Sequence, residues 1–439
     1  MTWWMLLLGG LGSLIVLMFL GLPIFVAFLV LNVGTVLVYF GPAGFGLFAN
    51  SIFSTATNST LATVPLFIVM GEILFRSGAM EAVFDALDRF VGRVRGRQYY
   101  LAILLSAVLG ALSGAAIAVA GLLGRSLYPS MVNRGYNKRL STGTLLGGAS
   151  LDPIIPPSIL AVIIAALAEV STAGMLIAGI IPGLILMVLF LIYIAWKLKR
   201  DPSLAPEIAV DESAGKSRQS ALVALLRVLP CAFVFFMVIG FIMFGVATPT
   251  ESAATGVFGA VIVSLVYGRF SIKMLMEAFT TAATVTGLVL MIMVSATMFS
   301  QVLSFSGAPA AIGHFVTQLS LPAWLMIFAL LAVPFVLFMF LDQLAVMLVL
   351  IPIYKPLINV YQFDPIWFWT LFLLTATVGG LTPPFGYVLF AMKSAVPSLS
   401  LSEIYNASWP FVLIIVFGIF ILWLFPPLVT FLPNLASNK

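Results

Sequence analysis

The chain has 439 residues, of which 62% are hydrophobic and only 8% are charged. Apolar runs of about 20 residues recur along most of its length, and the short alternating segments of a transmembrane barrel are absent. Only helices then satisfy the backbone polar groups in lipid, so the predicted fold class is an all-α polytopic membrane protein. The net charge of +5 fits basic cytoplasmic loops, and no nucleic acid is expected as a partner.

Cys231 is the one cysteine of the sequence, and His314 is the one histidine. An intramolecular disulfide is therefore excluded, and so is a site that needs two imidazoles or a Cys/His cluster. We expect neither zinc nor haem chemistry, and no organic cofactor.

The first apolar run continues to about Tyr39 without a basic region or a cleavage site, so it is predicted to be a retained span. Segments rich in Lys and Arg are placed in the cytoplasm, and loops without them, such as residues 50–60, are placed outside. About ten crossings follow. They are predicted at residues 4–22, 24–40, 60–76, 140–170, 174–196, 228–247, 252–267, 276–304, 366–396 and 409–426.

Two apolar stretches do not fit as crossings. Residues 98–127 have basic segments on both sides, and residues 322–358 have external loops on both sides. Each stretch must enter and leave by the same face, which predicts two re-entrant hairpins. Residues 78–97 carry apolar side chains at helical spacing with acidic and basic residues opposite, which predicts an amphipathic arm helix at the membrane surface.

A polar segment at residues 197–227 is predicted to be a cytoplasmic linker between two halves, 1–196 and 228–439. Pro129, Pro156 and Pro157 recur as Pro356, Pro383 and Pro384, each 227 positions later (356 − 129, for example). This indicates an internal repeat, and the five crossings per half make it an inverted one, as in many secondary transporters. The first copy comprises spans at 1–76, arm 78–97, hairpin 98–127, broken helix 140–170 and span 174–196. The second comprises spans at 228–304, arm 307–321, hairpin 322–358, broken helix 366–396 and span 409–426.

Proline and glycine interrupt one predicted span in each half. The breaks read "GGASLDPIIPPS" at residues 147–158 and "TATVGGLTPPFG" at residues 375–386. Proline ends one helix and starts the next, while glycine lets the backbone turn. Unwound carbonyls and helix C-termini then suit a cation, and helix N-termini suit an anion.

We pair each break with the hairpin tip of its own half and predict one sodium site per pair, because sodium prefers oxygen ligands. Each pair holds one carboxylate, Asp152 in the first break and Asp342 at the second tip. The first site comprises Gly110, Ser113, Gly114, Gly148, Ser150 and Asp152. The second comprises Leu341, Asp342, Thr375, Gly379, Gly380 and Thr382. Substrate contacts are predicted at Ser113, Pro156, Pro157, Ser158, Thr382, Pro383 and Pro384.

Structural roles are the alternatives for several of these residues. Asp152 could cap the half-helix that follows it, and the breaks could serve the helix interruption alone. Glu72 lies four residues before Arg76, which predicts an ion pair within one helix. Glu251 is predicted to be a first-turn helix acid.

The segments "LGLPIFVAF", "GALSGAAIAVAGLLG", "DPIIPPSIL", "ATPTESAATGVFGAVI", "FLDQLAVMLVLIPIYKPL" and "GGLTPPFGYVLF" occur in this order. Together they resemble the DctM-type large membrane subunit of the tripartite ATP-independent periplasmic (TRAP) transporters. The resemblance implies an elevator-type transport domain, which holds both hairpins and both breaks, and import of an organic acid driven by a sodium gradient, with two or more sodium ions.

The same resemblance implies partners and a location. They are a small four-helix membrane subunit (DctQ-type) on a separate chain, a periplasmic substrate-binding protein, and the inner membrane of a bacterium or archaeon. Family members often carry Ser and Asp where this chain has Ala115 and Val119, so the first sodium site would depend more on Ser113, Asp152 and the backbone.

Two other readings stay open at this point. A stand-alone divalent-anion/sodium symporter of similar architecture would work without a binding protein. An intramembrane enzyme would need its two aspartates to act as in an aspartyl protease; we expect no enzyme and no catalytic residue.

Overall fold

The computed structural model describes residues 9–10, 12–14, 16–18, 20–92, 94–114, 116–206 and 221–437. Within these residues all regular structure is helical, which confirms the all-α prediction for the described part of the chain. Six helical stretches are long and apolar enough to cross a membrane: Ser59–Arg76, Thr172–Arg200, Pro249–Val266, Ile272–Phe305, Gln343–Val360 and Leu401–Leu424. Shorter apolar helices accompany them, and the number of crossings stays a prediction. Residues 4–8, 11, 15 and 19 of the predicted first span and 207–220 of the predicted linker lie outside the described residues.

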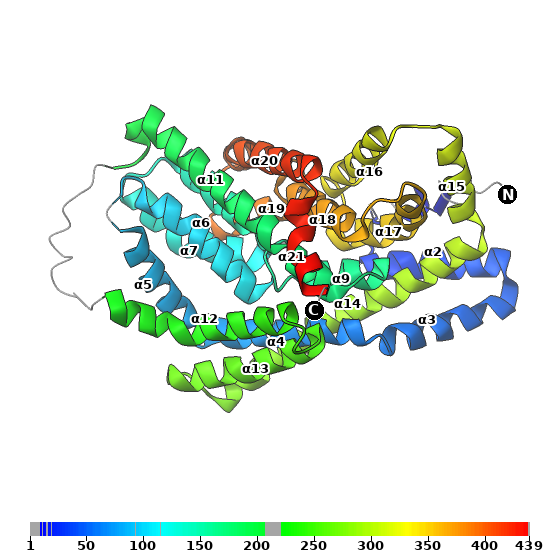
Figure 1. Ribbon diagram of the computed structural model, residues 1–439, viewed down its shortest axis with the longest axis horizontal. Helices are drawn as coiled ribbons and strands as arrows, with labels where there is room; N and C mark the ends of the chain where they lie inside the picture. The colour runs from blue at the N-terminus through cyan, green and yellow to red at the C-terminus, as the bar shows by residue number, and fades with distance from the viewer. Residues whose placement is uncertain are drawn as a thin grey trace.

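A long layer of helices runs along the lower side of the molecule in Figure 1. Helix α13 packs against α4 and α12, and α14 packs against α2, α3 and α4. Elements from both halves of the chain therefore interleave in this layer. Its members are α2 (Ile24–Tyr39), α3 (Gly46–Ala56), α4 (Thr63–Arg76), α12 (Ala221–Met243), α13 (Pro249–Val266) and α14 (Ile272–Phe305).

Helix α3 corrects one prediction, because residues 50–60 are not simply a loop. The helix continues to Ala56, and the 3₁₀ turn η2 (Ser59–Ala62) then leads into α4. Asn58 separates the two by accepting the Thr60 N–H at 3.0 Å. The stretch lacks Lys and Arg, which indicates its side of the membrane, but it also lacks Gly and Pro between residues 47 and 62, so nothing in it ends a helix early.

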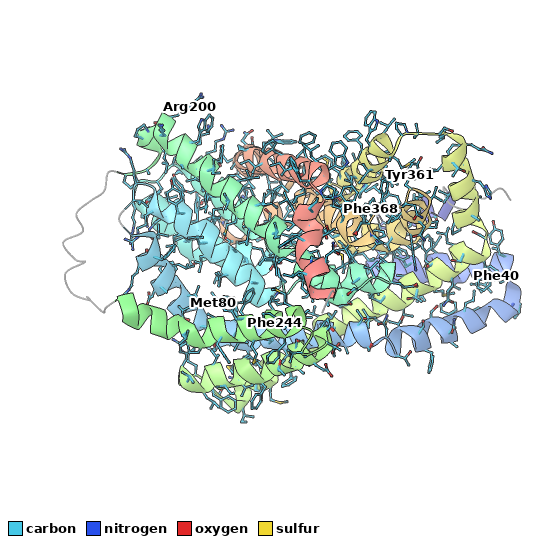
Figure 2. The ribbon with its side chains drawn as sticks, in the orientation of Figure 1. Phe40, Met80, Arg200, Phe244, Tyr361 and Phe368 are labelled. Carbon is cyan, nitrogen blue, oxygen red and sulfur yellow. The ribbon has the colours of Figure 1, made fainter. Side chains whose placement is uncertain are left out.

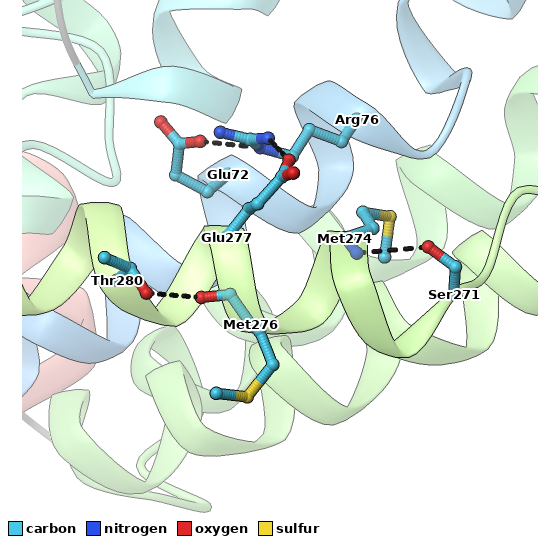
Figure 3. A network of polar contacts seen from close by, with 7 residues as sticks. All are labelled: Glu72, Arg76, Ser271, Met274, Met276, Glu277 and Thr280. Atoms are coloured by element: carbon cyan, nitrogen blue, oxygen red, sulfur yellow. Dashed lines mark hydrogen bonds and ion pairs between the residues drawn. The ribbon is translucent and has the colours of Figure 1, made fainter.

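An arginine ties α4 to α14 at one end of the layer (Figure 3). Arg76 Nε lies 3.0 Å from Glu72 Oε2, which confirms the predicted pair within α4. The same guanidinium donates from Nη1 to Glu277 Oε2 of α14 at 2.5 Å. The predicted first-turn acid of α13 is also confirmed, because Glu251 forms a capping box with Thr248.

The arm helix α5 (Ala79–Val91) follows α4 and packs against α12. Gly78 permits the turn between α4 and α5, since its φ of 85° lies in the left-handed region. Arg269 packs beside this glycine, and its Nη1 lies 3.4 Å from Glu81 of the arm. In the second half of the chain, α15 (Ala308–Gln318) joins α14 to the second hairpin.

Each stretch predicted to be a hairpin forms two helices that pack against one another. The first pair is α6 (Arg97–Ser113) and α7 (Ala116–Asn133), and the second is α16 (Ala323–Phe338) and α17 (Gln343–Val360). The first therefore continues six residues beyond the predicted end at 127. Both pairs lie above the long layer in Figure 1.

The two spans with breaks are each divided into two helices. They are α8 (Lys138–Ala149) with α9 (Ile159–Ala168), and α18 (Pro365–Leu381) with α19 (Tyr387–Ala395). All residues of α8 from Leu140 and all residues of α18 from Trp367 are buried. A helix that is covered on every side belongs to the core, so both breaks begin in the centre of the molecule.

The remaining helices are α10 (Thr172–Ala178), α11 (Ile180–Arg200), α20 (Leu401–Leu424) and α21 (Pro427–Ser437). Helix α20 packs against α8, α11 and α18. Large apolar side chains stay exposed on the outer helices; Phe244 in Figure 2, Phe236 and Phe258 are 60%, 71% and 69% exposed on the long layer. Such a surface is suited to lipid or to another membrane protein.

Candidate functional site

The first break is closed at both ends by serine hydroxyls. Ser150 Oγ donates to the Gly147 carbonyl of α8 at 2.7 Å, while Ser158 Oγ accepts the Ala161 N–H of α9 at 3.2 Å. Ser158 therefore caps α9, and the alternative role of Asp152 as that cap is wrong. Ser158 also donates to the Pro153 carbonyl at 2.5 Å, which closes the unwound segment on itself. Asp152 is 3% exposed.

The first hairpin tip lies directly on this break. A Cβ atom at Gly110 would stand 3.0 Å from the Cα and Cβ of Asp152 and 3.2 Å from its Oδ1. Gly114 ends α6 with a φ of 61°, and a Cβ there would stand 3.3 Å from Ile159 Cδ1. Gly148 packs still more closely, because a Cβ there would stand 2.3 Å from Ser106 Oγ of α6. Glycine at these positions allows tip and break to meet; the Ser113 side chain and Ala115 lie outside the described residues.

Gly179 holds the break from its other side, at the junction of α10 and α11. A Cβ atom at this position would stand 2.1 Å from the Ile154 carbonyl oxygen. Only glycine allows that carbonyl to approach the junction so closely. The unwound segment is thus enclosed between the hairpin tip and the α10–α11 helices.

The second hairpin tip and the second break are joined through the backbone. Phe385 N–H donates to the Met339 carbonyl at 3.3 Å. Gly379 lies against the end of α16, because a Cβ there would stand 2.1 Å from Phe338 Cβ. Gly386 N–H donates to the Thr382 carbonyl at 3.2 Å and closes the unwound turn. As in the first half, the break meets the hairpin tip that precedes it in the chain.

Asp342, unlike Asp152, caps a helix. Its carboxylate accepts the Leu344 N–H at 2.8 Å and so starts α17. The side chain is exposed in the isolated chain, unlike that of Asp152, and Leu341 beside it is half-buried. One carboxylate is therefore enclosed in its break, and the other is accessible at its tip.

The hydroxyl groups at the second break already donate to the backbone. Thr375 donates to the Phe372 carbonyl at 2.7 Å, and Thr382 donates to the Val378 carbonyl at 2.6 Å. Ser158 behaves in the same way at the first break. Since the hydroxyl hydrogens are used, these oxygens can offer only lone pairs to a ligand. They are suited to a cation and not to an anion.

The predicted substrate residues differ in accessibility between the breaks. Pro156, Pro157 and Ser158 are buried, whereas Pro383 and Pro384 are half-buried and the neighbouring Phe385 is 55% exposed. Thr382 is fully buried. Both Pro-Pro bonds are cis. The second break is thus the more open of the two.

The second helix of each hairpin packs against a helix from the other half of the chain. Helix α7 of the first hairpin packs against α19, and α17 of the second hairpin packs against α9. The first contact is close, because a Cβ at Gly124 would stand 2.8 Å from Ala395 Cβ and 3.0 Å from Met392 Sδ. Each hairpin tip contacts the break of its own half. The second helix of each hairpin contacts the half-helix that follows the break of the other half. All four segments therefore form one packed body.

Tyr387 connects the two candidate sites and was not among the predicted residues. Its side chain bonds to Gln343 and lies within electrostatic range of both Asp152 and Asp342. Its ring covers Gly380, where a Cβ would stand 2.2 Å from Tyr387 Cε1. Gln343 Nε2 also donates to the Ala376 carbonyl at 2.6 Å, next to the break. Tyr387 is the first residue of α19, and Gln343 directly follows Asp342 at the second hairpin tip. Nothing local in the sequence indicates that the two side chains meet.

Oxygen atoms are the main polar groups that the two tip-and-break pairs offer. Among the described residues, no three His, Cys, Asp or Glu side chains gather as a metal cluster. A cation held here would be bound by backbone carbonyls and hydroxyls together with one aspartate per pair. That donor set fits a hard monovalent cation, as the sequence predicts.

An ion pair joins the second hairpin to the first broken helix. Lys355 Nζ of α17 lies 2.5 Å from Glu169 Oε2 at the end of α9. Glu169 adopts a φ of 56° as the C-cap of α9, which turns the chain at this point. The pair joins the second hairpin to the first broken helix, far apart in sequence.

Comparisons with known proteins bear on the whole chain. Residues 11–428 match the family model described as "Tripartite ATP-independent periplasmic transporter, DctM component". A C4-dicarboxylate TRAP transporter large permease protein of Pseudomonas aeruginosa is 29% identical over 401 residues, which cover 91% of this chain and 92% of that protein. A putative TRAP transporter large permease protein of Haemophilus influenzae is 30% identical over 372 residues, 84% and 85% of the two chains. An ectoine/5-hydroxyectoine TRAP transporter large permease protein of Ruegeria pomeroyi is 27% identical over 97% of this chain and 98% of its own.

Solved structures with the same fold are more distant in sequence. The YdaH transporter of Alcanivorax borkumensis superimposes with a TM-score of 0.62 at 13% identity, over 88% of this chain and 87% of its own. MtrF of Neisseria gonorrhoeae gives a TM-score of 0.60 at 12% identity, over 88% and 85% of the chains. At this level of identity the likeness concerns the fold alone.

Proposed function

The chain belongs to the DctM component family of the tripartite ATP-independent periplasmic transporters, and on this premise we propose that it is the permease subunit that imports an organic acid with sodium. Three relatives are described as permeases for C4-dicarboxylates, ectoine and 2,3-diketo-L-gulonate. The shared chemistry of these names favours a small carboxylate as the substrate class here. The membrane would be the inner membrane of a bacterium or archaeon.

Sodium binding is proposed at each tip-and-break pair. The observation that carries this proposal is the contact of Gly110 with Asp152, which puts a carboxylate and unwound carbonyls beside a hairpin tip. The first site would use Gly110, Gly114, Gly148, Ser150 and Asp152, with Ser113. The second would use Leu341, Asp342, Thr375, Gly379, Gly380 and Thr382. One aspartate per pair nearly neutralises one monovalent cation, which lowers the cost of holding that charge away from water.

The substrate carboxylate is proposed to lie at the second break. Helix α19 starts at Tyr387 without a side-chain cap on Gly386. The Leu389 N–H already donates to the Gly386 carbonyl at 2.9 Å, so the N–H groups of Tyr387 and Val388 are the ones proposed to face an anion. Pro383, Pro384 and Phe385 form an accessible wall beside this helix start. A sodium ion at the neighbouring second site would attract the substrate carboxylate to the start of α19, because their charges are opposite. Pro156, Pro157 and Ser158 would form the matching wall on the first break.

An elevator movement is proposed for the body made by the hairpins and broken helices. The crossed contacts of α7 with α19 and of α17 with α9 support movement as one unit. The long layer, with its Arg76 link between α4 and α14, would be the stationary part. Its exposed apolar side chains would be covered by lipid and by the small four-helix subunit, while a periplasmic binding protein delivers the substrate.

The proposal is tested by uptake into proteoliposomes that hold this chain with its small subunit. A labelled C4-dicarboxylate is supplied with the binding protein encoded beside the two membrane subunits. Uptake should require an inward sodium gradient and the binding protein together. Equal uptake with a potassium gradient would reject sodium coupling, and uptake without the binding protein would favour the stand-alone symporter.

A further inference from the structure

A basic cavity of about 290 Å³ lies at the start of α8, between that helix, α11 and α20. Its polar lining comes from Asn137, Arg139, Tyr193 and Lys197, and its apolar lining comes from Leu140, Leu204, Ala407, Pro410 and Phe411. A neighbouring cavity of about 390 Å³ shares Asn137 and Arg139 and adds Lys138. Cations and an apolar wall therefore meet at one place, at the opposite end of α8 from the first break.

The basic residues at the end of α11 indicate that the cavity lies at the level of the lipid headgroups. Helix α11 ends with Lys197, Lys199 and Arg200 in its last turn, within the segment that the charge distribution places in the cytoplasm. Trp196 is 45% exposed beside them, and the Arg200 guanidinium lies 4.6 Å from its ring centre. Tryptophan and basic residues gather where a helix leaves the membrane. Lipid headgroups of the cytoplasmic leaflet lie at the same depth.

The cations of this cavity are held in place without being neutralised. Arg139 donates from Nε and Nη2 to the Asn406 carbonyl at 3.2 and 3.0 Å. Lys197 Nζ lies 5.5 Å from the Trp196 ring centre. The ion pairs found in the described part of the chain involve neither of these two cations. Both charges stay available to an anion.

One carboxylate is close enough to oppose an anion. Glu403 lines the neighbouring cavity, where its carboxylate accepts the Ser400 N–H and hydroxyl at 2.8 and 2.7 Å. It faces Lys138 and Lys393, which balance it. Arg139 and Lys197 therefore remain the uncompensated charges on the cavity wall.

We propose that the basic cavity binds the headgroup of an anionic phospholipid. Arg139 and Lys197 hold the phosphate through charge-assisted hydrogen bonds, while Leu140 and Phe411 contact the glycerol and the first acyl carbons. The apolar lining favours a lipid over free phosphate, because a soluble anion gains nothing from it. The two helices that bound the cavity also carry exposed apolar residues, among them Ile192 on α11 and Leu413 on α20, as a lipid-facing surface does.

Phe411 links the basic cavity to the core. A Cβ at Gly147 of α8 would stand 2.2 Å from Phe411 Cδ1, so α8 and α20 touch through this ring. Helix α8 starts at the cavity and ends at the first break. A lipid seated on Arg139 and Phe411 therefore braces the helix that leads to Asp152.

Native mass spectrometry of the purified chain tests the proposal, with phosphatidylglycerol, phosphatidylcholine and inorganic phosphate as separate probes. Phosphatidylglycerol should be retained over phosphatidylcholine. In the double variant R139Q/K197Q its affinity should fall roughly thirtyfold, as two lost cations at headgroup level imply. The control R125Q/K273Q removes two other cytoplasmic cations and should retain the lipid.

A charge-conserving variant, R139K/K197R, guards against a folding defect and should restore most of the retention. Size-exclusion profiles confirm that each variant is folded. Three results would each overturn the proposal: equal retention of both lipids by the unaltered chain, unchanged retention by R139Q/K197Q, or displacement of the lipid by inorganic phosphate at a similar concentration. The last would identify a soluble-anion site.

Discussion

Gly110 at the end of the first hairpin arm lies against Asp152 in the first break, with room for no side chain between them. A Cβ at position 110 would stand 3.0 Å from both the Cα and the Cβ of the aspartate. The hairpin tip and the unwound backbone therefore form one surface, and the carboxylate stays buried beside it. This contact is the basis for the first sodium site.

Replacing Gly110 with alanine should disturb that site without removing a ligand side chain. The added methyl group meets Asp152, and such overpacking costs about 1–3 kcal/mol. We expect the sodium concentration for half-maximal uptake to rise roughly tenfold in Gly110→Ala. Gly121→Ala is the matched control, because its Cβ would meet only Arg125 Nη2 at 3.8 Å. Equal sodium dependence in both variants would contradict the proposed contact.

Asp342 allows charge and helix capping to be separated. Asparagine caps a helix about as well as aspartate, so Asp342→Asn keeps the cap of α17 and loses the charge, while Asp342→Ala loses both. The free energy of unfolding, measured in mixed micelles, should fall by about 1 kcal/mol for the alanine variant only. Sodium stimulation of uptake should be lost in both. If only the alanine variant lost it, Asp342 would be a cap and not a sodium ligand.

Tyr387→Phe removes a hydroxyl that lies beside Gly380 of the second break. The ring still covers Gly380, so the fold should be kept, while the bond to Gln343 is lost. Because that hydroxyl lies within electrostatic range of both aspartates, the steepness of uptake against sodium concentration should fall. Tyr361→Phe is the control; its hydroxyl donates to the Leu321 carbonyl at 3.1 Å, outside the sites. Identical sodium curves for both variants would remove Tyr387 from the account.

The link between α4 and α14 should contribute little to stability because its side chains are partly exposed. Arg76 and Glu277 are 32% and 47% exposed. A double-mutant cycle with Arg76→Gln and Glu277→Gln should give a coupling free energy of about 0.2–1 kcal/mol. The cycle is measured by unfolding in mixed micelles, with Glu72→Gln as the comparison within one helix. A coupling free energy near zero would show that the link does not join the halves.

Local features of the sequence predicted much of the fold. Proline and glycine act within a few residues of themselves, so both breaks could be located from Pro156, Pro383 and their neighbours. The two hairpins were predicted from the charge of the segments on either side of them. The Glu72–Arg76 pair was predictable for the same reason, since four residues is one helical turn. Residues 50–60 were misjudged because the absence of charge indicates a side of the membrane and not the end of a helix.

The sequence predicted that each hairpin tip pairs with a break, but the individual side-chain contacts between distant segments could not be predicted. Glu277 reaches Arg76 across 201 positions. Tyr387 and Gln343 meet because the unwound segment before α19 lies against the second tip. Periodicity gives no information on such pairs. The capping roles of the aspartates also depended on the turn geometry: Ser158 is placed to cap α9, which leaves Asp152 facing Gly110, whereas Asp342 starts its own helix.

Sodium binding to the purified chain tests the central claim, that each half supplies one cation site, most directly. Binding of radioactive sodium at saturation should be measured for the unaltered chain, for Asp152→Asn, for Asp342→Asn and for the double variant. We expect each single variant to lose about one ion per chain and the double variant to lose both, since each pair depends on a single carboxylate. The same saturation value in all four proteins would contradict the claim.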